Sequence, residues 1–349
     1  APPNKNAVAI EALSRLKGMD LEANPALKAA VLRVVSTTKG TPQFVELVRD
    51  FKLTDQGPAL LEYASSHSAD SSGVDALRLL VENGSLGLVK DGLKTTNAPA
   101  LLEVIANSAE KIFVSLIEPL VGDANVPPAI RKGAVHALAS TQDGAATLLK
   151  IAKEDRLPAD VKLISGAELS KARWPGIKEE AAKLLPLPQS QNAEPLPPIA
   201  ELTKLPGDAA KGAEVFARPL VGCINCHQVN GKGVNFAPNL SEIGTKLGKD
   251  ALYEAILDPS AGISFGFEAW QIELKNGDEA FGIITSDSAE EVTLKTQNGI
   301  SSKYKKSDIA KRTQMKTSIM PAGLQLTMSQ QDLVNLVEYL STLKKPTGH

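Results

Sequence analysis

The only two cysteines of this 349-residue chain lie three positions apart, and a histidine directly follows the second. Together they form the stretch Cys223-Ile224-Asn225-Cys226-His227. Two thiols at this spacing can both form thioethers with the vinyl groups of one haem, while the next imidazole reaches the iron as the proximal ligand. The motif therefore predicts one covalently attached haem c, held by Cys223 and Cys226, with His227 as an iron ligand.

Three other kinds of site can contain a cysteine pair, namely a zinc half-site, a redox dithiol and a disulfide. Zinc needs a second pair of ligands, and the chain has no further cysteine. A redox dithiol is expected in a βαβ context, which the sequence does not show. None of the three gives a role to His227, so haem attachment is the favoured interpretation.

The iron of a low-spin electron carrier needs a sixth ligand, which is usually a methionine sulfur. Met320 is the favoured ligand, because it lies in Ser318-Ile319-Met320-Pro321-Ala322-Gly323-Leu324, a loop whose proline and glycine constrain the backbone. The other methionines remain alternatives: Met19, Met315 and Met328. Three further histidines are theoretical ligands: His67, His136 and His349.

The composition excludes some classes of protein. Lys plus Arg number 38 and Asp plus Glu number 40, so the overall charge favours neither nucleic acid nor an acidic surface as a partner. No run of 18 or more apolar residues is present, and the first residues lack a basic stretch followed by an apolar one. We therefore expect a chain without a transmembrane segment, from which a signal peptide or an upstream domain is absent.

The first part of the chain, residues 1–185, is rich in Ala and Leu at helical spacing, with short breaks at Gly, Pro, Asn and Asp. The stretches 128–138 and 158–169 align at an offset of 30, and each precedes a second predicted helix, at 144–152 and 175–185. A weaker copy begins at Asn24. Helix pairs that repeat must stack to bury their apolar faces, so the pattern predicts a short α-solenoid that resembles HEAT repeats. An irregular helical bundle is the alternative.

A proline-rich segment at 186–206 predicts a semi-rigid linker between this region and a second domain at 207–349. In that domain we expect helices over 208–216, 247–257 and 329–343. Period-two alternation at 268–274, a turn at Asn276-Gly277 and strand-like runs at 281–285 and 291–296 predict an antiparallel β insertion at about 265–312.

The second domain resembles class I cytochrome c. In that family a proline carbonyl fixes the proximal histidine, which here implies Pro238 in the turn Ala237-Pro238-Asn239-Leu240. The resemblance also implies that Met320 is the axial methionine, and that Gly212 and Phe216 on the first helix pack against the last helix, at Leu336, Tyr339 and Leu340.

The β insertion makes the domain similar to the haem-binding domain described from planctomycetes and verrucomicrobia, which often follows helical repeats. That likeness spans about 140 residues, through the cysteine motif, Ala255-Ile256-Leu257-Asp258-Pro259-Ser260, Gly277-Asp278 and Met320-Pro321-Ala322-Gly323-Leu324. The propeller-type dehydrogenase domain carried by some members is absent from this sequence. The expected fold is therefore mainly α: a HEAT-like solenoid followed by a class I-like cytochrome c domain with a small antiparallel sheet.

These observations predict a periplasmic electron-transfer protein, not an enzyme, that accepts electrons from a dehydrogenase or another cytochrome. The rival interpretations are a haem enzyme or gas sensor with an open sixth site, and a functional solenoid to which the haem is accessory. Six cations that precede the Met320 loop are candidates to dock an acidic redox partner, or else to protect a sheet edge: Lys303, Lys305, Lys306, Lys311, Arg312 and Lys316. Three residues are candidates to contact haem propionates: Trp270, Tyr304 and Arg218.

Overall fold

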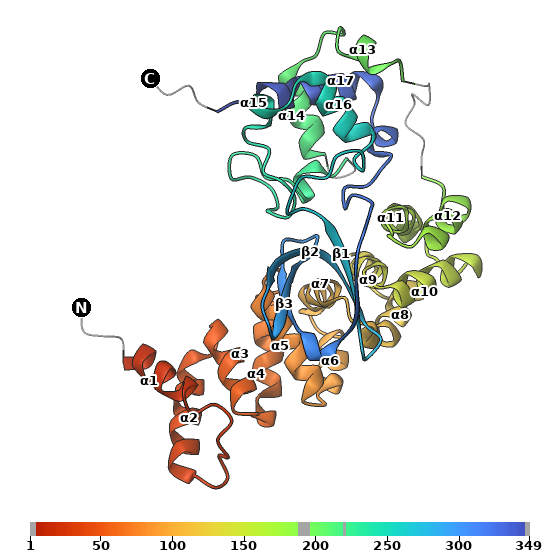
Figure 1. Ribbon diagram of the computed structural model, residues 1–349. Coiled ribbons are helices and arrows are strands. Elements are labelled where there is room, and N and C mark those ends of the chain that lie inside the picture. Colours follow the sequence, from red (N-terminus) through yellow and green to blue (C-terminus); the bar gives the residue numbers. More distant parts are fainter. Residues whose placement is uncertain (1–4, 188–195, 219–220, 346–349) are drawn as a thin grey trace. The chain divides into compact units, whose positions relative to one another are not determined.

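The computed structural model of the chain describes residues 5–187, 196–218 and 221–345 (Figure 1). The chain forms two compact units, Ala1–Glu168 and Leu169–His349. The predicted division into 1–185, 186–206 and 207–349 stays a prediction, and the predicted linker lies partly outside the described residues.

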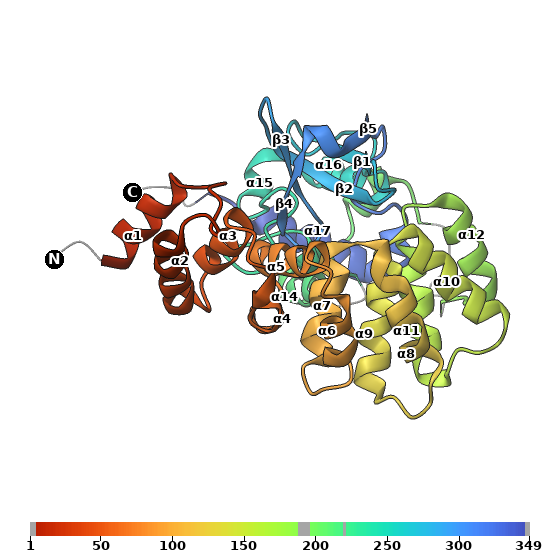
Figure 2. The ribbon, with the colours of Figure 1, turned by 90° about the horizontal axis from the view of Figure 1, so that it is seen from below.

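The first unit is built from short helices that follow one another along the chain (Figure 2). Their bounds are α1 Lys5–Ser14, α2 Pro25–Thr38, α3 Pro42–Asp50, η1 Thr54–Gln56, α4 Gly57–Ser66, α5 Ser71–Glu82, α6 Leu86–Gly92, α7 Ala98–Ser108, η2 Lys111–Phe113, α8 Val114–Gly122, α9 Pro128–Ala139, α10 Gln142–Lys153 and α11 Ala159–Ser170, the last of which continues into the second unit. Within this unit α3 packs on α5, α5 on α7, and α7 on α9.

The helices predicted from the internal repeats are present as α9, α10, α11 and, in the second unit, α12 (Pro175–Leu184), and α2 and α3 correspond to the weaker copy. The first helices of the two aligned stretches are joined by an ion pair, in which Arg131 of α9 donates through Nη2 to Oδ2 of Asp160 in α11 at 2.8 Å. Arg131 is 7% exposed, so this contact lies inside the unit. The mainly helical character is confirmed, and the HEAT-like solenoid stays a prediction.

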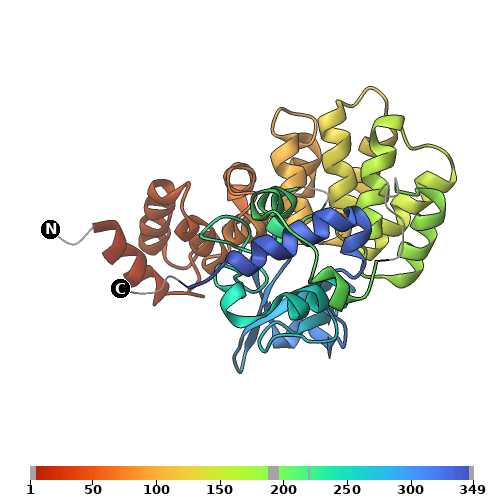
Figure 3. The same cartoon turned by 90° about the horizontal axis from the view of Figure 1, so that it is seen from above.

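The second unit combines helices with one sheet. Its helices are α12 Pro175–Leu184, α13 Ile199–Leu202, α14 Ala209–Ala217, η3 Cys223–Asn225, α15 Ile243–Lys246, α16 Lys249–Leu257, η4 Lys306–Asp308, η5 Leu324–Thr327 and α17 Gln330–Thr342. Figure 3 shows α17 as the long blue helix, and α14, α15 and α16 all pack against it.

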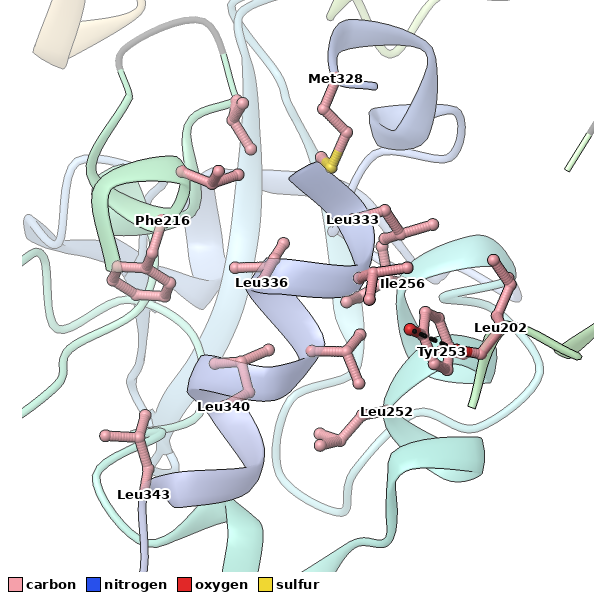
Figure 4. Packing of buried hydrophobic residues seen from close by; sticks show 14 of the residues in the cluster. Leu202, Phe216, Leu252, Tyr253, Ile256, Met328, Leu333, Leu336, Leu340 and Leu343 are labelled. Carbon is pink, nitrogen blue, oxygen red and sulfur yellow. Dashed lines mark hydrogen bonds between the residues drawn. The ribbon is translucent and has the colours of Figure 1, made fainter. Parts of the chain in front are cut away.

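The core of the helical part lies along the buried face of α17 (Figure 4). Leu336 and Leu340 of this helix face Phe216 of α14, and the Tyr253 hydroxyl of α16 donates to the Leu202 carbonyl oxygen at 3.3 Å. Ser329 caps α17 by accepting the backbone N–H of Asp332 at 3.0 Å, as expected for an N-cap serine.

The helices α14 and α17 approach each other closely at Gly212. A Cβ atom added at Gly212 would lie 2.0 Å from the Asn335 carbonyl oxygen and 2.6 Å from Cβ of Tyr339. Phe216, one turn further along α14, places its ring centroid 5.9 Å from that of Tyr339. Gly212 thus approaches the predicted Tyr339 and also the backbone of Asn335, and Phe216 packs against Tyr339 as predicted.

The sheet is antiparallel with strand order β4-β3-β2-β1-β5. Its strands are β1 Ala269–Leu274, β2 Glu279–Asp287, β3 Glu291–Lys295, β4 Ser301–Lys305 and β5 Ile309–Gln314. The small antiparallel sheet is therefore confirmed, and β4 and β5 add two edge strands to the three predicted runs. A separate small core fills one face of the sheet, formed by Ile272, Ala280, Val292, Leu294 and Tyr304.

Candidate functional site

The cysteine motif is a single tight turn. Gly222, with a φ of +77°, precedes the 3₁₀ turn η3, a conformation that glycine adopts without a steric penalty. The backbone N–H of Cys226 donates to the carbonyl oxygen of Cys223 at 3.2 Å, and that of His227 to the same oxygen at 2.9 Å. This turn holds Cys223, Cys226 and His227 in one hydrogen-bonded segment.

The imidazole of His227 is fixed by a backbone carbonyl. Its Nδ1 atom lies 2.8 Å from the carbonyl oxygen of Pro238, the contact that the family resemblance implies. A carbonyl only accepts, so Nδ1 carries the hydrogen and Nε2 keeps its lone pair for a metal. Burial lowers the pKa of His227, against the opposing effect of the Pro238 hydrogen bond, and favours this neutral form.

The loop that carries Pro238 is tied to the motif by its backbone. The N–H groups of Phe236 and Ala237 donate to the Cys226 carbonyl oxygen at 3.2 and 2.8 Å. Gly233 packs its backbone so closely that an added Cβ atom would lie 2.3 Å from the His227 carbonyl oxygen. These contacts fix the Pro238 carbonyl relative to the imidazole.

The two thiols are free, and each is partly buried. Burial raises the pKa of the Cys223 thiol to about 11. It also raises the pKa of Cys226, where a hydrogen bond from Gln297 opposes the effect. Both thiols are therefore protonated at neutral pH and poorly nucleophilic until they are activated.

Gln297 is a site residue that the sequence does not reveal. Its Nε2 atom lies 4.0 Å from Sγ of Cys226, although the two residues are 71 positions apart. Gln297 belongs to the turn between β3 and β4, and no local pattern links that turn to the cysteine motif.

Met320 borders the same core cluster as the cysteine motif. Its partly buried side chain packs against that cluster, as do those of Cys223 and Ile224. Two hydrogen bonds hold the loop. The Ser318 N–H donates to the Ser260 hydroxyl at 3.0 Å, and the Met320 N–H donates to the Ser318 hydroxyl within the loop at 3.2 Å.

The alternative methionines occupy different surroundings. Met328 is 4% exposed and points into the core beside α17 (Figure 4). Met315 follows β5, where its N–H donates to the Ala269 carbonyl oxygen at 2.8 Å. Met19 is 46% exposed in the first unit.

Two of the alternative histidines have partners in the first unit. The His67 ring stacks on Tyr63 with centroids 4.0 Å apart, and His136 lies 3.4 Å from a carboxylate oxygen of Glu168. His349 lies outside the described residues.

The three propionate candidates have other contacts in the second unit, and their role stays a prediction. Arg218 pairs with Asp332, and Trp270 lies 4.9 Å beneath the guanidinium of Arg312. Tyr304 is 9% exposed within the core of the sheet.

The six candidate docking cations lie on β4, η4, β5 and the segment after β5. Four of them pair with carboxylates of the same sheet: Lys303 with Glu291, Lys306 and Arg312 with Asp287, and Lys311 with Glu273. These pairs offset much of the positive charge that the sequence alone indicates.

The donor set at the motif fits a covalently attached haem. Two free thiols are available for thioethers, and the adjacent imidazole has Nδ1 already satisfied. Among the described residues, no three His, Cys, Asp or Glu side chains cluster closely enough to hold a metal ion.

Comparison with known proteins identifies the domain. Residues 209–344 match the family model for cytochrome c, so this part of the chain forms a c-type cytochrome domain. The family implies a covalently bound haem c, and it suggests haem-based electron transfer with redox partners. No curated protein matches the chain. In the part of the chain that the structure describes, no helix is both long and apolar enough to cross a membrane.

Proposed function

We propose that the cytochrome c domain at residues 209–344 binds one haem with His227 and Met320 as axial ligands and passes single electrons between redox proteins. The observation that carries this proposal is the 2.8 Å contact of His227 Nδ1 with the Pro238 carbonyl oxygen, directly beside two free thiols. It leaves Nε2 as a metal ligand of fixed orientation.

Each residue of the motif has a distinct role in this proposal. The Cys223 and Cys226 thiols would hold the haem by adding across its vinyl groups, each forming a carbon–sulfur bond while the thiol proton moves to the neighbouring carbon, so no oxidant would be needed. When bound, the haem iron supplies a one-electron change between its ferric and ferrous forms. His227 orients the metal from one side, and the Pro238 carbonyl prevents the imidazole from turning.

We assign the sixth position to Met320. Its side chain packs against the same core as Cys223, and its loop is held by the Ser318–Ser260 hydrogen bond. A thioether ligand favours ferrous iron and raises the reduction potential. Met328 is instead part of the core, where methionine commonly fills irregular space.

In this proposal the chain transforms no substrate. The helices of the first unit act as HEAT-like repeats that dock a partner or position the haem domain. We place the protein in the periplasm, where it accepts electrons from a dehydrogenase or another cytochrome, as the likeness to the planctomycete and verrucomicrobial haem-binding domain suggests.

Electrostatic steering of an acidic partner would depend mainly on Lys305 and Lys316. These two are the candidates for which no ion pair is found among the described residues, whereas the other four lie beside carboxylates. We expect a rate of electron exchange that falls only modestly with ionic strength.

Intact-mass analysis of matured protein tests the proposal. We expect the mass of the polypeptide plus one haem, retained after denaturation, and a Cys223→Ser, Cys226→Ser double variant should lose it. A parent protein at the bare polypeptide mass would overturn the proposal.

A second measurement separates the electron carrier from a gas sensor or haem enzyme. Ferric protein with methionine ligation should show the near-infrared sulfur-to-iron band. A high-spin ferric spectrum, with a reduced form that binds carbon monoxide, would instead indicate an open sixth site.

A further inference from the structure

The turn between β3 and β4 lies on the cysteine motif. The turn spans residues 296–300 and is closed by two backbone hydrogen bonds, from Thr296 N–H to the Ile300 carbonyl oxygen and from Gly299 N–H to the Thr296 carbonyl oxygen, both at 2.8 Å. Gly299 has a φ of +78°, and Ile300 is 3% exposed. The turn is therefore a defined structure that presents Gln297 at its tip.

Two separate contacts connect this turn with the haem-attachment segment. The Gln297 amide lies 4.0 Å from the Cys226 sulfur. A Cβ atom added at Gly299 would lie 3.1 Å from Cγ1 of Val234 and 3.8 Å from the Asn235 carbonyl oxygen. Val234 and Asn235 belong to the loop that leads to Pro238, so the turn contacts both the attachment sulfur and the loop that orients His227.

The contacts of the turn with the cysteine motif lie outside the small core of the sheet. Its core is formed by residues of β1 to β4, and none of the five buried members comes from residues 296–300. The contacts of the turn with Cys226 and Val234 are consequently additional to those that hold the sheet together. They connect the inserted sheet to the site where a haem would be attached.

We propose that the β3–β4 turn is part of the haem pocket, and that Gln297 is a positioning residue for the second attachment sulfur. This inference rests on the proposed function. An amide N–H directed at the sulfur places the positive end of its dipole beside the attached porphyrin, which favours the added electron of the ferrous state.

Two substitutions at Gln297 separate the donated hydrogen from the shape of the side chain. Gln297→Leu keeps much of the bulk but has no donor, and Gln297→Glu keeps the shape and replaces the donor with a negative charge. The reduction potential of the full-length haem protein should fall in the order parent, Gln297→Leu, Gln297→Glu. We expect the ratio of reduced to oxidised protein at a fixed solution potential to fall about twofold for Gln297→Leu, and further for Gln297→Glu. Gln314→Leu, an exposed glutamine on β5, is the matched control and should leave the ratio unchanged.

A pair of glycine substitutions tests the position of the turn. Gly299 and Gly277 both have a left-handed backbone, with φ of +78° and +83°, in turns of the same sheet. Alanine introduces comparable backbone strain at both, and at Gly299 the new Cβ also meets Val234. Gly299→Ala should therefore shift the reduction potential and leave a fraction of chains with a free Cys226 thiol, whereas Gly277→Ala should do neither. Alkylation of the denatured protein, followed by mass spectrometry, measures the fraction of chains with a free thiol.

The outcomes distinguish this inference from the proposed function. If parent protein carries no haem, the proposed function fails. A second outcome is that the parent protein carries haem on both cysteines, and that both Gln297 variants and Gly299→Ala keep the parent reduction potential and complete haem attachment. The role of the turn is then disproved, while the proposed function stands. A shift of equal size in Gly277→Ala would also disprove it, because the effect would then come from the sheet in general.

Discussion

Arg218 donates two parallel hydrogen bonds to Asp332, from Nη1 to Oδ2 and from Nη2 to Oδ1, each at 2.9 Å. Arg218 follows the end of α14, and Asp332 lies in the first turn of α17. The pair therefore joins the two helices that pack most closely in the cytochrome domain. Asp332 also accepts the backbone N–H of Ser329, the N-cap of α17, at 3.2 Å.

We predict that this pair stabilises the domain at neutral pH and not in acid. The hydrogen bonds from Arg218 hold the pKa of Asp332 below its ordinary value, with a smaller contribution from Ser329. A lowered folded-state pKa adds stability that is fully present above the unfolded pKa, about 3.9, and that is lost as the pH falls through the folded pKa. Because the Arg218 side chain is 45% exposed, solvent screening limits the effect to about 0.5–1 kcal/mol.

Urea unfolding of the parent and Arg218→Ala from pH 7 down to about pH 2 measures this effect. The difference in free energy of unfolding should shrink as Asp332 becomes protonated. Arg218→Lys keeps the charge without the planar fork and should lie between the two. A difference that stays constant over the whole pH range would contradict the assignment.

The second prediction concerns Gly212 and the effect of helix packing on the stability of the domain. Alanine at this position brings a Cβ atom against the Asn335 carbonyl of α17, so Gly212→Ala should destabilise the domain by about 1–3 kcal/mol. Gly176 in α12 has nothing within 4 Å of the equivalent position, and Gly176→Ala should be neutral or stabilise by about 0.4–1 kcal/mol. Thermal unfolding of both variants compares them directly, and equal losses of stability would show that helix packing is not the cause.

The candidate haem-attachment residues can be proposed from the sequence because the bond geometry of a haem would fix their spacing. Cys223, Cys226 and His227 lie within five positions. The Pro238 contact, which the family resemblance implies, spans only 11 positions. The cap of α17 was predictable because Ser329 and Asp332 are only three residues apart. Interactions between residues that are close in the sequence can be recognised from the spacing of those residues.

Features that depend on distant pairing were not readable. Strand β4 has the sequence Ser-Ser-Lys-Tyr-Lys, in which Ser302 and Tyr304 are the buried positions, so a polar residue occupies one of its two core sites. Strand β5 lies at an edge and carries Lys311 and Arg312. The Gln297–Cys226 contact spans 71 positions and leaves no periodic signal in the sequence.

Arg173 makes another contact between residues far apart in the sequence, and it leads to a third prediction. It lies before the predicted linker, yet its Nη2 atom donates to Oε2 of Glu279 on β2 at 3.2 Å, across 106 positions. Its guanidinium lies 4.2 Å from the Trp174 ring centroid and 5.3 Å from that of Phe281. The second unit, which contains the cytochrome c domain, therefore includes residues that precede the proline-rich segment.

We expect Arg173→Ala to destabilise this unit by about 1–3 kcal/mol, because the half-buried Glu279 carboxylate loses its partner and two aromatic rings lose their stacked cation. Arg173→Lys should recover part of the loss, since it keeps the charge without the planar contact. Both tryptophans of the chain lie in this unit, so tryptophan fluorescence during urea unfolding reports on it. Unchanged unfolding of Arg173→Ala would mean that the contact contributes nothing to the folded unit.

The fourth prediction concerns the sixth ligand. Met320→Ala should remove the near-infrared sulfur-to-iron band and lower the reduction potential. The shift should be on the order of tenths of a volt, because axial ligands span a range of roughly 0.8 V. A redox titration of the variant beside the parent measures it.

Matched variants separate ligation from packing. Met328→Leu conserves volume in the core and should cost less than about 1.5 kcal/mol while leaving the potential unchanged. Met315→Leu, beside the paired end of β5, should also keep the potential. An unchanged reduction potential in Met320→Ala would rule out Met320 as the ligand. Loss of the near-infrared band in Met315→Leu or Met328→Leu would transfer the assignment to that residue. The reason is that only removal of the coordinating sulfur abolishes a sulfur-to-iron transition while the thioethers keep the haem attached.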